Sequence, residues 1–211
     1  MFARLTRVGG VVAVALATSI AAAPAASAST HPAAGTSSLA ALLAKDGSGF
    51  DRNGGDFDIT DNAIRTVLQA KPQSAVGVLA DGTVALTAFL PNDRAFERLA
   101  TDLTGRHYAS ESRTLGVLAG KLGVDTIESV LLYHVVPGST ITYAQARRSN
   151  GAVLATALSG ATVKVRVSCR YVTLVDADPD DRNPTVVKRN LNQGNRQIAH
   201  GINRVLRPVN L

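Results

Sequence analysis

The chain has 211 residues, with 22 Lys and Arg against 16 Asp and Glu and a formal net charge of +6. It has no run of five or more basic residues, 4% aromatic residues and no Trp, which argues against nucleic-acid partners and against stacking platforms for bases or sugars. Its one cysteine, Cys169, excludes an internal disulfide, and the length predicts a single domain with one hydrophobic core.

The N-terminus is typical of a secretory signal peptide. Two arginines precede an apolar stretch at residues 11–17, and the small residues Ala-Ser-Ala follow at 26–28. No segment approaches the roughly 18 apolar residues of a membrane span. We therefore expect residues 1–28 to be a signal peptide, residues 29–49 to be a flexible leader, and residues 50–211 to form the folded domain of a secreted protein.

Residues 50–61 form an acidic, turn-rich stretch that superficially matches a calcium-binding loop. With Asp51 in the first position, however, Gly55 replaces an oxygen ligand and Asp56 stands where glycine is needed. Asn62 also replaces the bidentate glutamate that ends such loops. We interpret the stretch as a solvated turn that caps the next helix.

Hydrophobic periodicity predicts alternating helices and strands in the middle of the chain. In chain order these are a helix over 60–70, a strand over 83–90, a helix from Asp93 or Arg94 to 103, and a helix over 113–122. Beyond Gly123, Asp125 and Glu128 have the spacing of a capping box. The helix that they begin is expected to lead into a strand at Val135 and Val136, with Tyr133 and His134 at the junction.

The last third of the chain predicts β-structure. We expect a short helix capped by Thr142, strands over 153–158, 162–167 and 171–176, an acidic insert over 176–184, and a closing strand pair over 198–202 and 205–208. Lys164 and Arg166 would share the outer face of their strand, because alternate residues point to the same side. A turn at residues 168–170 would expose Cys169, which could then support a disulfide-linked dimer.

Three stretches together resemble the conserved segments of fasciclin-like (FAS1) domains. Residues 87–96 (TAFLPNDRAF) resemble the first box, residues 131–138 (LLYHVVPG) the segment around the Tyr-His motif, and residues 198–208 (IAHGINRVLRP) the second box. The order and spacing of these three stretches match those of the family over residues 50–211. The sequence departs from the family pattern at Arg196-Gln197, where Asn-Gly is usual, and in the acidic insert.

The resemblance implies a compact α+β fold, a β-sandwich or wedge of short strands with helices packed along one side. It also implies a secreted, non-catalytic adhesion or interaction module without a cofactor, whose partner is a cell-surface or matrix protein or an acidic wall polymer or glycan. The alternative is a secreted binding protein for a small molecule or acidic polymer, or a hydrolase, with a pocket near the Tyr-His junction. The sequence contains neither G-x-S-x-G nor H-E-x-x-H.

Tyr133 and His134 admit two interpretations. The resemblance implies a recognition site, whereas their position at a helix-strand junction favours a structural pair that satisfies buried backbone groups, which is the interpretation we prefer. His200 has the same structural interpretation. With His134 it supplies two metal ligands, and a catalytic zinc site needs three.

Two polar surfaces remain as candidates. The basic face of Lys164 and Arg166, with Arg170 nearby, is the expected binding surface. In the acidic insert, Asp176, Asp178 and Asp180 have the alternate spacing of hard-cation ligands. Two prolines and the lack of a central glycine favour a solvated loop instead, with Arg182 as a neutralising charge.

Overall fold

A four-stranded sheet lies at the centre of the part of the chain that the computed structural model describes, residues 34–47 and 49–211. Its order is β2-β1-β7-β6, with β1 parallel to β7 and the outer pairs antiparallel. The strands are β1 (Leu86–Pro91), β2 (Val135–Pro137), β6 (Val186–Leu191) and β7 (Gln197–Ile202). Every residue of β1 and β7 is buried, because both faces of the sheet are covered.

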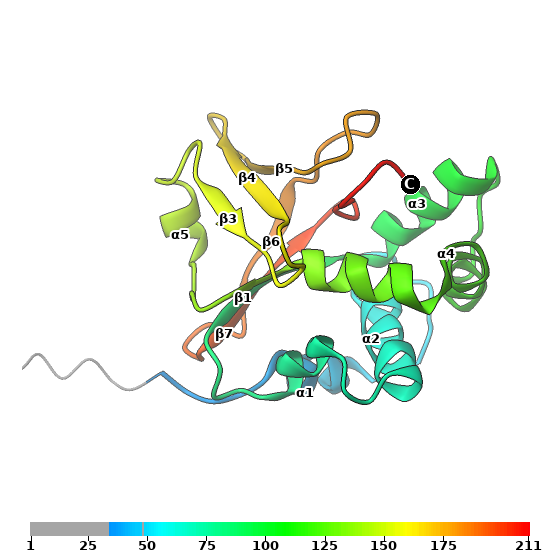
Figure 1. Cartoon of the computed structure of the whole chain (residues 1–211), viewed down its shortest axis with the longest axis horizontal. Coiled ribbons are helices and arrows are strands. Elements are labelled where there is room, and N and C mark those ends of the chain that lie inside the picture. The colour runs from blue at the N-terminus through cyan, green and yellow to red at the C-terminus, as the bar shows by residue number, and fades with distance from the viewer. Residues whose placement is uncertain (1–33, 48) are drawn as a thin grey trace, which may run out of the picture. The chain divides into compact units, whose positions relative to one another are not determined.

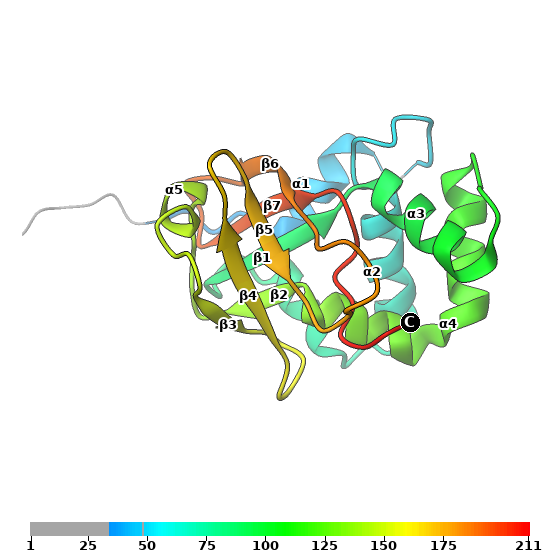
Figure 2. The ribbon, with the colours of Figure 1, turned by 90° about the horizontal axis from the view of Figure 1, so that it is seen from above.

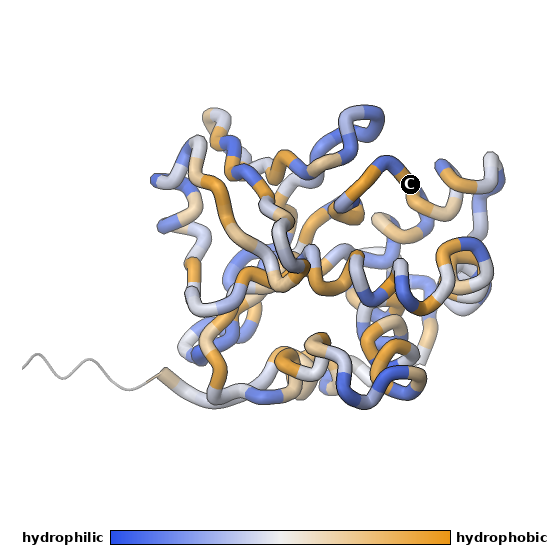
Figure 3. Tube along the Cα trace, viewed as in Figure 1, coloured by the Kyte–Doolittle hydropathy of each residue, from blue (hydrophilic) through white to orange (hydrophobic). Residues whose placement is uncertain are grey.

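A three-stranded antiparallel sheet covers one face of the central sheet (Figure 1). It consists of β3 (Val153–Ala155), β4 (Thr162–Val167) and β5 (Val172–Val175). Val163, Val165 and Leu174 on its inner side pack in one cluster with Phe89 and Ile202 of the central sheet. The alternation of polar and apolar residues along β4 follows from this one-sided burial (Figure 3).

Helices cover the other face and pack against one another (Figure 2). They are α2 (Asp58–Ala70), α3 (Asp93–Thr104) and α4 (Glu111–Tyr133), with a 3-10 segment η2 at Ala75–Ala80. Asn92 and Ser110 cap α3 and α4 through side-chain oxygens that accept backbone N–H groups. Gly123, with φ of 74°, interrupts α4 and confirms the predicted boundary between two helical segments. No described helix is long and apolar enough to cross a membrane.

The α+β fold class is confirmed, and so is the predicted hairpin between β4 and β5, whose turn is closed by hydrogen bonds between Ser168 and Tyr171. The short helix α5 (Tyr143–Ala146) begins with the predicted cap, since Thr142 forms a full capping box with Gln145. The closing strand pair was predicted wrongly. The antiparallel partner of β7 is β6, whereas residues 205–208 are irregular.

The expected boundary at Phe50 is corrected, because residues 34–47 belong to the folded unit. They contain α1 (Leu39–Leu43) and a 3-10 turn, η1 (Ala44–Asp46), and Leu39 is fully buried. A Cβ added at Gly82 would lie 1.7 Å from the carbonyl oxygen of Thr36, so this segment is in close contact with the domain. The expected signal peptide, residues 1–28, lies outside the described residues.

The departure from the family pattern at Gln197 explains how this segment is held. Gln197 is fully buried in β7, and its side-chain oxygen accepts the N–H of Leu39 at 2.8 Å. Its amide nitrogen donates to the carbonyl oxygens of Val78 and Asp81, both at 2.8 Å. A buried glutamine with all these bonds joins the N-terminal segment, η2 and the central sheet.

Candidate functional site

The Tyr-His pair lies inside the molecule, where α4 ends and β2 begins. His134 is 3% exposed, and Tyr133 is 1% exposed with its hydroxyl donating to the carbonyl oxygen of Thr162 at 2.9 Å. Burial raises the pKa of Tyr133 to about 12. In this arrangement neither polar group faces a partner at the surface.

His134 connects two distant parts of the chain through both ring nitrogens. Nδ1 lies 2.7 Å from the carbonyl oxygen of Val130, and Nε2 lies 2.9 Å from the N–H of Leu206. The Leu206 N–H is a donor, so Nε2 accepts and the neutral ring carries its proton on Nδ1. Burial lowers the pKa of His134 to about 4, which keeps the ring neutral. These contacts favour the structural interpretation.

His200 in β7 is held in the same manner. Its Nε2 lies 2.8 Å from the carbonyl oxygen of Ile141, and Nδ1 accepts the N–H of Asn190 at 3.3 Å. Burial lowers its pKa as well. The cavity next to it, lined mainly by apolar side chains of both sheets, has a volume of about 50 Å³. Such a cavity holds a water or two, whereas sites for small-molecule ligands are about 300–1,000 Å³.

The basic face is exposed as the alternation predicted. Lys164 and Arg166 lie on the outer side of β4, and Arg170 lies in the turn that leads to β5. Exposed apolar side chains lie beside them: Val153, opposite Lys164 in β3, is 62% exposed, and Tyr171 is 55% exposed. We refer to these five residues as the basic face.

Cys169 is a free, exposed thiol in the β4–β5 turn, which confirms the predicted turn. Its carbonyl oxygen accepts from the guanidinium of Arg147 at 3.3 Å, and the carbonyl oxygen of Arg170 accepts from the Tyr143 hydroxyl at 3.3 Å. These two bonds tie the turn to α5. The turn therefore places the thiol at one end of the basic face.

The acidic insert is neutralised by an arginine from the C-terminal segment, and we call the group the arginine-centred cluster. Its members are Arg207 and the carboxylates Asp102, Asp176, Asp178 and Asp181. The Arg207 guanidinium lies 2.6 Å from Asp102 and 3.2 Å from both Asp178 and Asp181, and Asp176 accepts the Arg207 N–H at 2.8 Å. Asp178 is buried, so the expectation of a solvated loop is wrong for it.

Arg182, the residue expected to neutralise the acidic insert, does not do so. Arg204 pairs with Asp181 at 2.6 Å, and Asp180 bonds the side-chain amide of Asn210, whereas Arg182 is exposed. Asp176, Asp178 and Asp180 are thus each engaged by the C-terminal segment. Burial raises the pKa of Asp176 to about 6.

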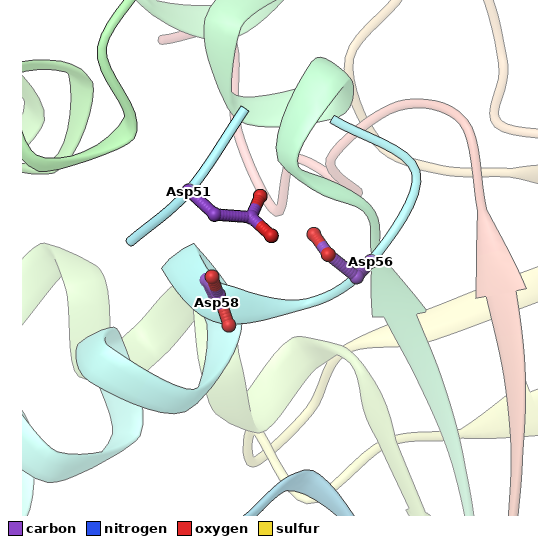
Figure 4. Close-up of side chains that lie close together, drawn as sticks. All are labelled: Asp51, Asp56 and Asp58. Carbon is purple, nitrogen blue, oxygen red and sulfur yellow. The ribbon is translucent and has the colours of Figure 1, made fainter. Parts of the chain in front are cut away.

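A second group of acids, which we call the carboxylate cluster, forms where α2, α3 and α4 begin. Its members are Asp51 and Asp56 of the turn before α2, and Asp58, Asp93 and Glu111, the first residues of the three helices. Ligand oxygens of Asp51, Asp56 and Asp58 lie within 4.8 Å of one another (Figure 4), as do those of Asp56, Asp93 and Glu111. All but Asp51 are buried.

The predicted solvated turn at 51–61 is therefore corrected, and the predicted cap is replaced by one from another helix. The carboxylate of Asp93 accepts the N–H groups of Ile59 at 2.8 Å and Asp58 at 3.3 Å, which caps α2. Glu111 accepts the N–H of Asp51 at 2.7 Å, which fixes the turn. The cluster was missed because its members are up to 60 positions apart. The local signals were an acid near the start of each predicted helix and the acidic stretch from Asp51, whose mismatch with a calcium-binding loop led to its interpretation as a solvated turn.

Comparisons with known proteins place the chain in a structural context. A sequence model of the fasciclin domain family matches residues 62–208. A solved structure, described as a novel fold revealed by a FAS1 domain pair from the insect cell adhesion molecule fasciclin I, is similar with a TM-score of 0.43 and 17% sequence identity. The similarity covers 70% of this chain and 46% of that one, so the chain matches about half of the domain pair. No curated protein matches the chain.

Proposed function

The chain belongs to the fasciclin domain family, and from that premise we propose that it is a secreted, non-catalytic interaction module. Its partner would be a cell-surface or matrix protein, or an acidic wall polymer or glycan. The observation that carries this proposal is the basic face, where Lys164 and Arg166 are exposed on an antiparallel sheet and Arg170 is exposed in the adjoining turn.

The composition of the basic face supports a binding role. Tyr171 and Val153 are large exposed apolar side chains next to the three cations. Arginines and aromatic residues are enriched at protein interfaces, and clustered positive charge attracts anionic polymers. Because the cations are exposed, the attraction is expected to weaken as salt rises above about 0.1 M.

The alternative of a pocket near the Tyr-His junction has less support. His134 uses both ring nitrogens in backbone hydrogen bonds, so it has no free position for a substrate proton. The cavity beside His200, about 50 Å³, is too small for a sugar or a comparable ligand. A non-catalytic module therefore fits the geometry better than a hydrolase.

The test is retention of the purified protein on its own cell envelopes at increasing NaCl. The double variant Lys164→Glu/Arg166→Glu reverses two charges on the basic face, and we expect it to lose most of the bound fraction at 0.1 M salt, with wild type released at about 0.5 M. The matched control is Arg106→Glu/Lys121→Glu, which makes the same charge change at exposed positions on the helical side. Equal loss in both variants, or retention independent of salt, would refute the proposal.

A disulfide-linked dimer through Cys169 remains a prediction. Two copies joined at this exposed turn would present two basic faces and bind a polymer with higher avidity. Oxidised wild type is expected to run as a dimer on a non-reducing gel, and Cys169→Ser as a monomer. A monomeric wild type after oxidation would remove this part of the proposal.

A further inference from the structure

The carboxylate cluster holds more negative charge than its protein environment compensates. The N-termini of α2, α3 and α4 meet there, and each helix contributes roughly half a positive charge, about +1.5 in total. The carboxylates of Asp51, Asp56 and Glu111 oppose this. Among the described residues, the ion pairs include none of Asp51, Asp56, Asp93 and Glu111. Helix dipoles therefore compensate only about half of the charge on these three carboxylates.

Asp56 provides an independent observation that points to a ligand. It is 5% exposed, and its Oδ1 atom is fully buried without a hydrogen-bond partner among the described residues. Figure 4 shows its carboxylate directed toward that of Asp51. Leaving a charged oxygen buried and unpaired is costly, and such groups in native structures generally mark a bound water or ion.

We propose that the carboxylate cluster is a calcium site, in which Asp51, Asp56 and Asp58 supply the ligand oxygens. Calcium is bound by oxygens at about 2.3–2.6 Å, so oxygens on opposite sides of the ion are about 4.6–5.2 Å apart. The ligand oxygens of the three carboxylates lie within 4.8 Å of one another, so a single calcium ion can reach all three. Magnesium requires a near-ideal octahedron, which this mixed loop-and-helix arrangement suits less well.

The surroundings suit a weak extracellular type of site. Asp51 is exposed, so waters can reach the ion and complete the six to eight ligands that calcium takes. Asp93 and Glu111 lie behind the ligands and add negative potential, while their backbone bonds hold the turn and α2 in place. Calcium sites in extracellular modules have dissociation constants of about 10⁻⁴–10⁻³ M, which is the affinity expected here. This site is separate from the basic face and does not depend on its role.

The test is calorimetric titration of CaCl2 into the full EDTA-treated protein at constant pH, with melting temperatures in parallel. We expect one ion per chain and a rise in Tm of about 3–10 °C at 10 mM calcium, from the ratio of concentration to Kd for a chain of this size. Asp56→Asn keeps the shape but removes the central charge, and should weaken binding at least tenfold. Asp180→Asn removes an exposed acid of the other acidic region and should leave binding unchanged.

The exposed Asp51→Asn variant guards against a folding defect in Asp56→Asn, and it should weaken calcium binding severalfold with the same melting temperature in EDTA. A wild type that calcium does not stabilise would overturn the proposal. So would equal calcium binding by wild type and Asp56→Asn. An equal response to magnesium would overturn the assignment to calcium, and loss of binding in Asp180→Asn alone would move the site to the acidic insert.

Discussion

The carboxylate cluster and the arginine-centred cluster contain similar numbers of acids in opposite electrostatic states, although four are buried in the first and only Asp178 in the second. In the arginine-centred cluster, the Arg207 guanidinium lies within 3.2 Å of Asp102, Asp178 and Asp181. In the carboxylate cluster, Asp93 and Glu111 accept backbone N–H groups, Asp93 also shares a side-chain hydrogen bond with Asp56, and Asp56 Oδ1 has no hydrogen-bond partner among the described residues. The first region is neutralised within the chain, and the second is left to an outside cation or a proton.

This difference shows that burial of an acid alone says little about its effect on stability. A buried carboxylate beside a buried guanidinium recovers much of its lost hydration, and removing one partner exposes the full desolvation cost of the other. A buried carboxylate beside other carboxylates has no such compensation. Substitution of the same residue type should therefore have opposite consequences in the two regions.

The largest effect on stability is expected from removing Arg207, the central cation of the arginine-centred cluster. Arg207→Met leaves the Asp178 side chain, which is 0% exposed, without its partner. We expect a loss of about 3–5 kcal/mol in the free energy of unfolding, measured by urea denaturation. The control is Arg182→Met, an exposed arginine of the same loop, with an expected change under about 0.5 kcal/mol. Similar losses in both variants would contradict the pairing.

The stability of the protein should depend on pH, because titratable groups hold the backbone of the C-terminal segment that carries Arg207. His134 and Asp176 accept the consecutive N–H groups of Leu206 and Arg207. The folded pKa of His134, about 4, lies below its ordinary value of 6.5, so the unfolded chain binds the proton more readily. His134 therefore contributes stability above about pH 6.5, and this contribution is lost as the pH falls toward 4.

Between pH 8 and pH 5 this loss is about 2 kcal/mol. Asp176 acts in the opposite direction, because its folded pKa of about 6 favours protonation of the folded state on acidification. Urea denaturation of wild type and His134→Gln at pH 8 and pH 5 separates the contribution of His134 from that of Asp176. The variant should be less stable at pH 8 but lose about 2 kcal/mol less on acidification. Parallel losses would show that His134 does not titrate as the structure implies.

Removing one charge from each region tests the comparison most directly. Asp178→Asn weakens a charged hydrogen bond to Arg207 and should destabilise the protein by about 1–2 kcal/mol. Asp56→Asn removes repulsion without losing a bond at Oδ1, and in EDTA it should stabilise by about 1 kcal/mol. Urea denaturation of both variants in one buffer containing EDTA measures the change in the free energy of unfolding for each. A change of the same sign in both variants would remove the distinction between the two clusters.

Much of the fold could be predicted from the sequence, because local patterns determine the elements. The cap at Thr142 and the break at Gly123 mark helix ends, and alternation along 162–167 determines which side of β4 is buried. The strand β6 was missed because its residues, VVKRNL, do not alternate clearly, and β-bulges shift its register with β7.

The two acidic regions show why the sites were harder to predict. Asp176, Asp178 and Asp180 are close in sequence, but the groups that bind them come from the end of the chain: Arg207 binds Asp176 and Asp178, and Asn210 binds Asp180. The carboxylate cluster joins the starts of three helices, so its existence depends on tertiary packing. Helix-helix contacts of this kind leave little trace in a single sequence beyond an acid at each helix start.

The smallest expected effect is the response of the two regions to salt. Added NaCl screens repulsion near the exposed Asp51 more than it weakens the buried pair of Arg207 and Asp178, because buried charges are screened less. In EDTA, wild type should therefore gain about 0.5 kcal/mol between 0.05 and 0.5 M NaCl, and Asp56→Asn should gain less than wild type. Asp180→Asn should gain as much as wild type, since it leaves the cluster intact. If Asp56→Asn responds to salt as wild type does, the repulsion that attracts the cation is not located at Asp56.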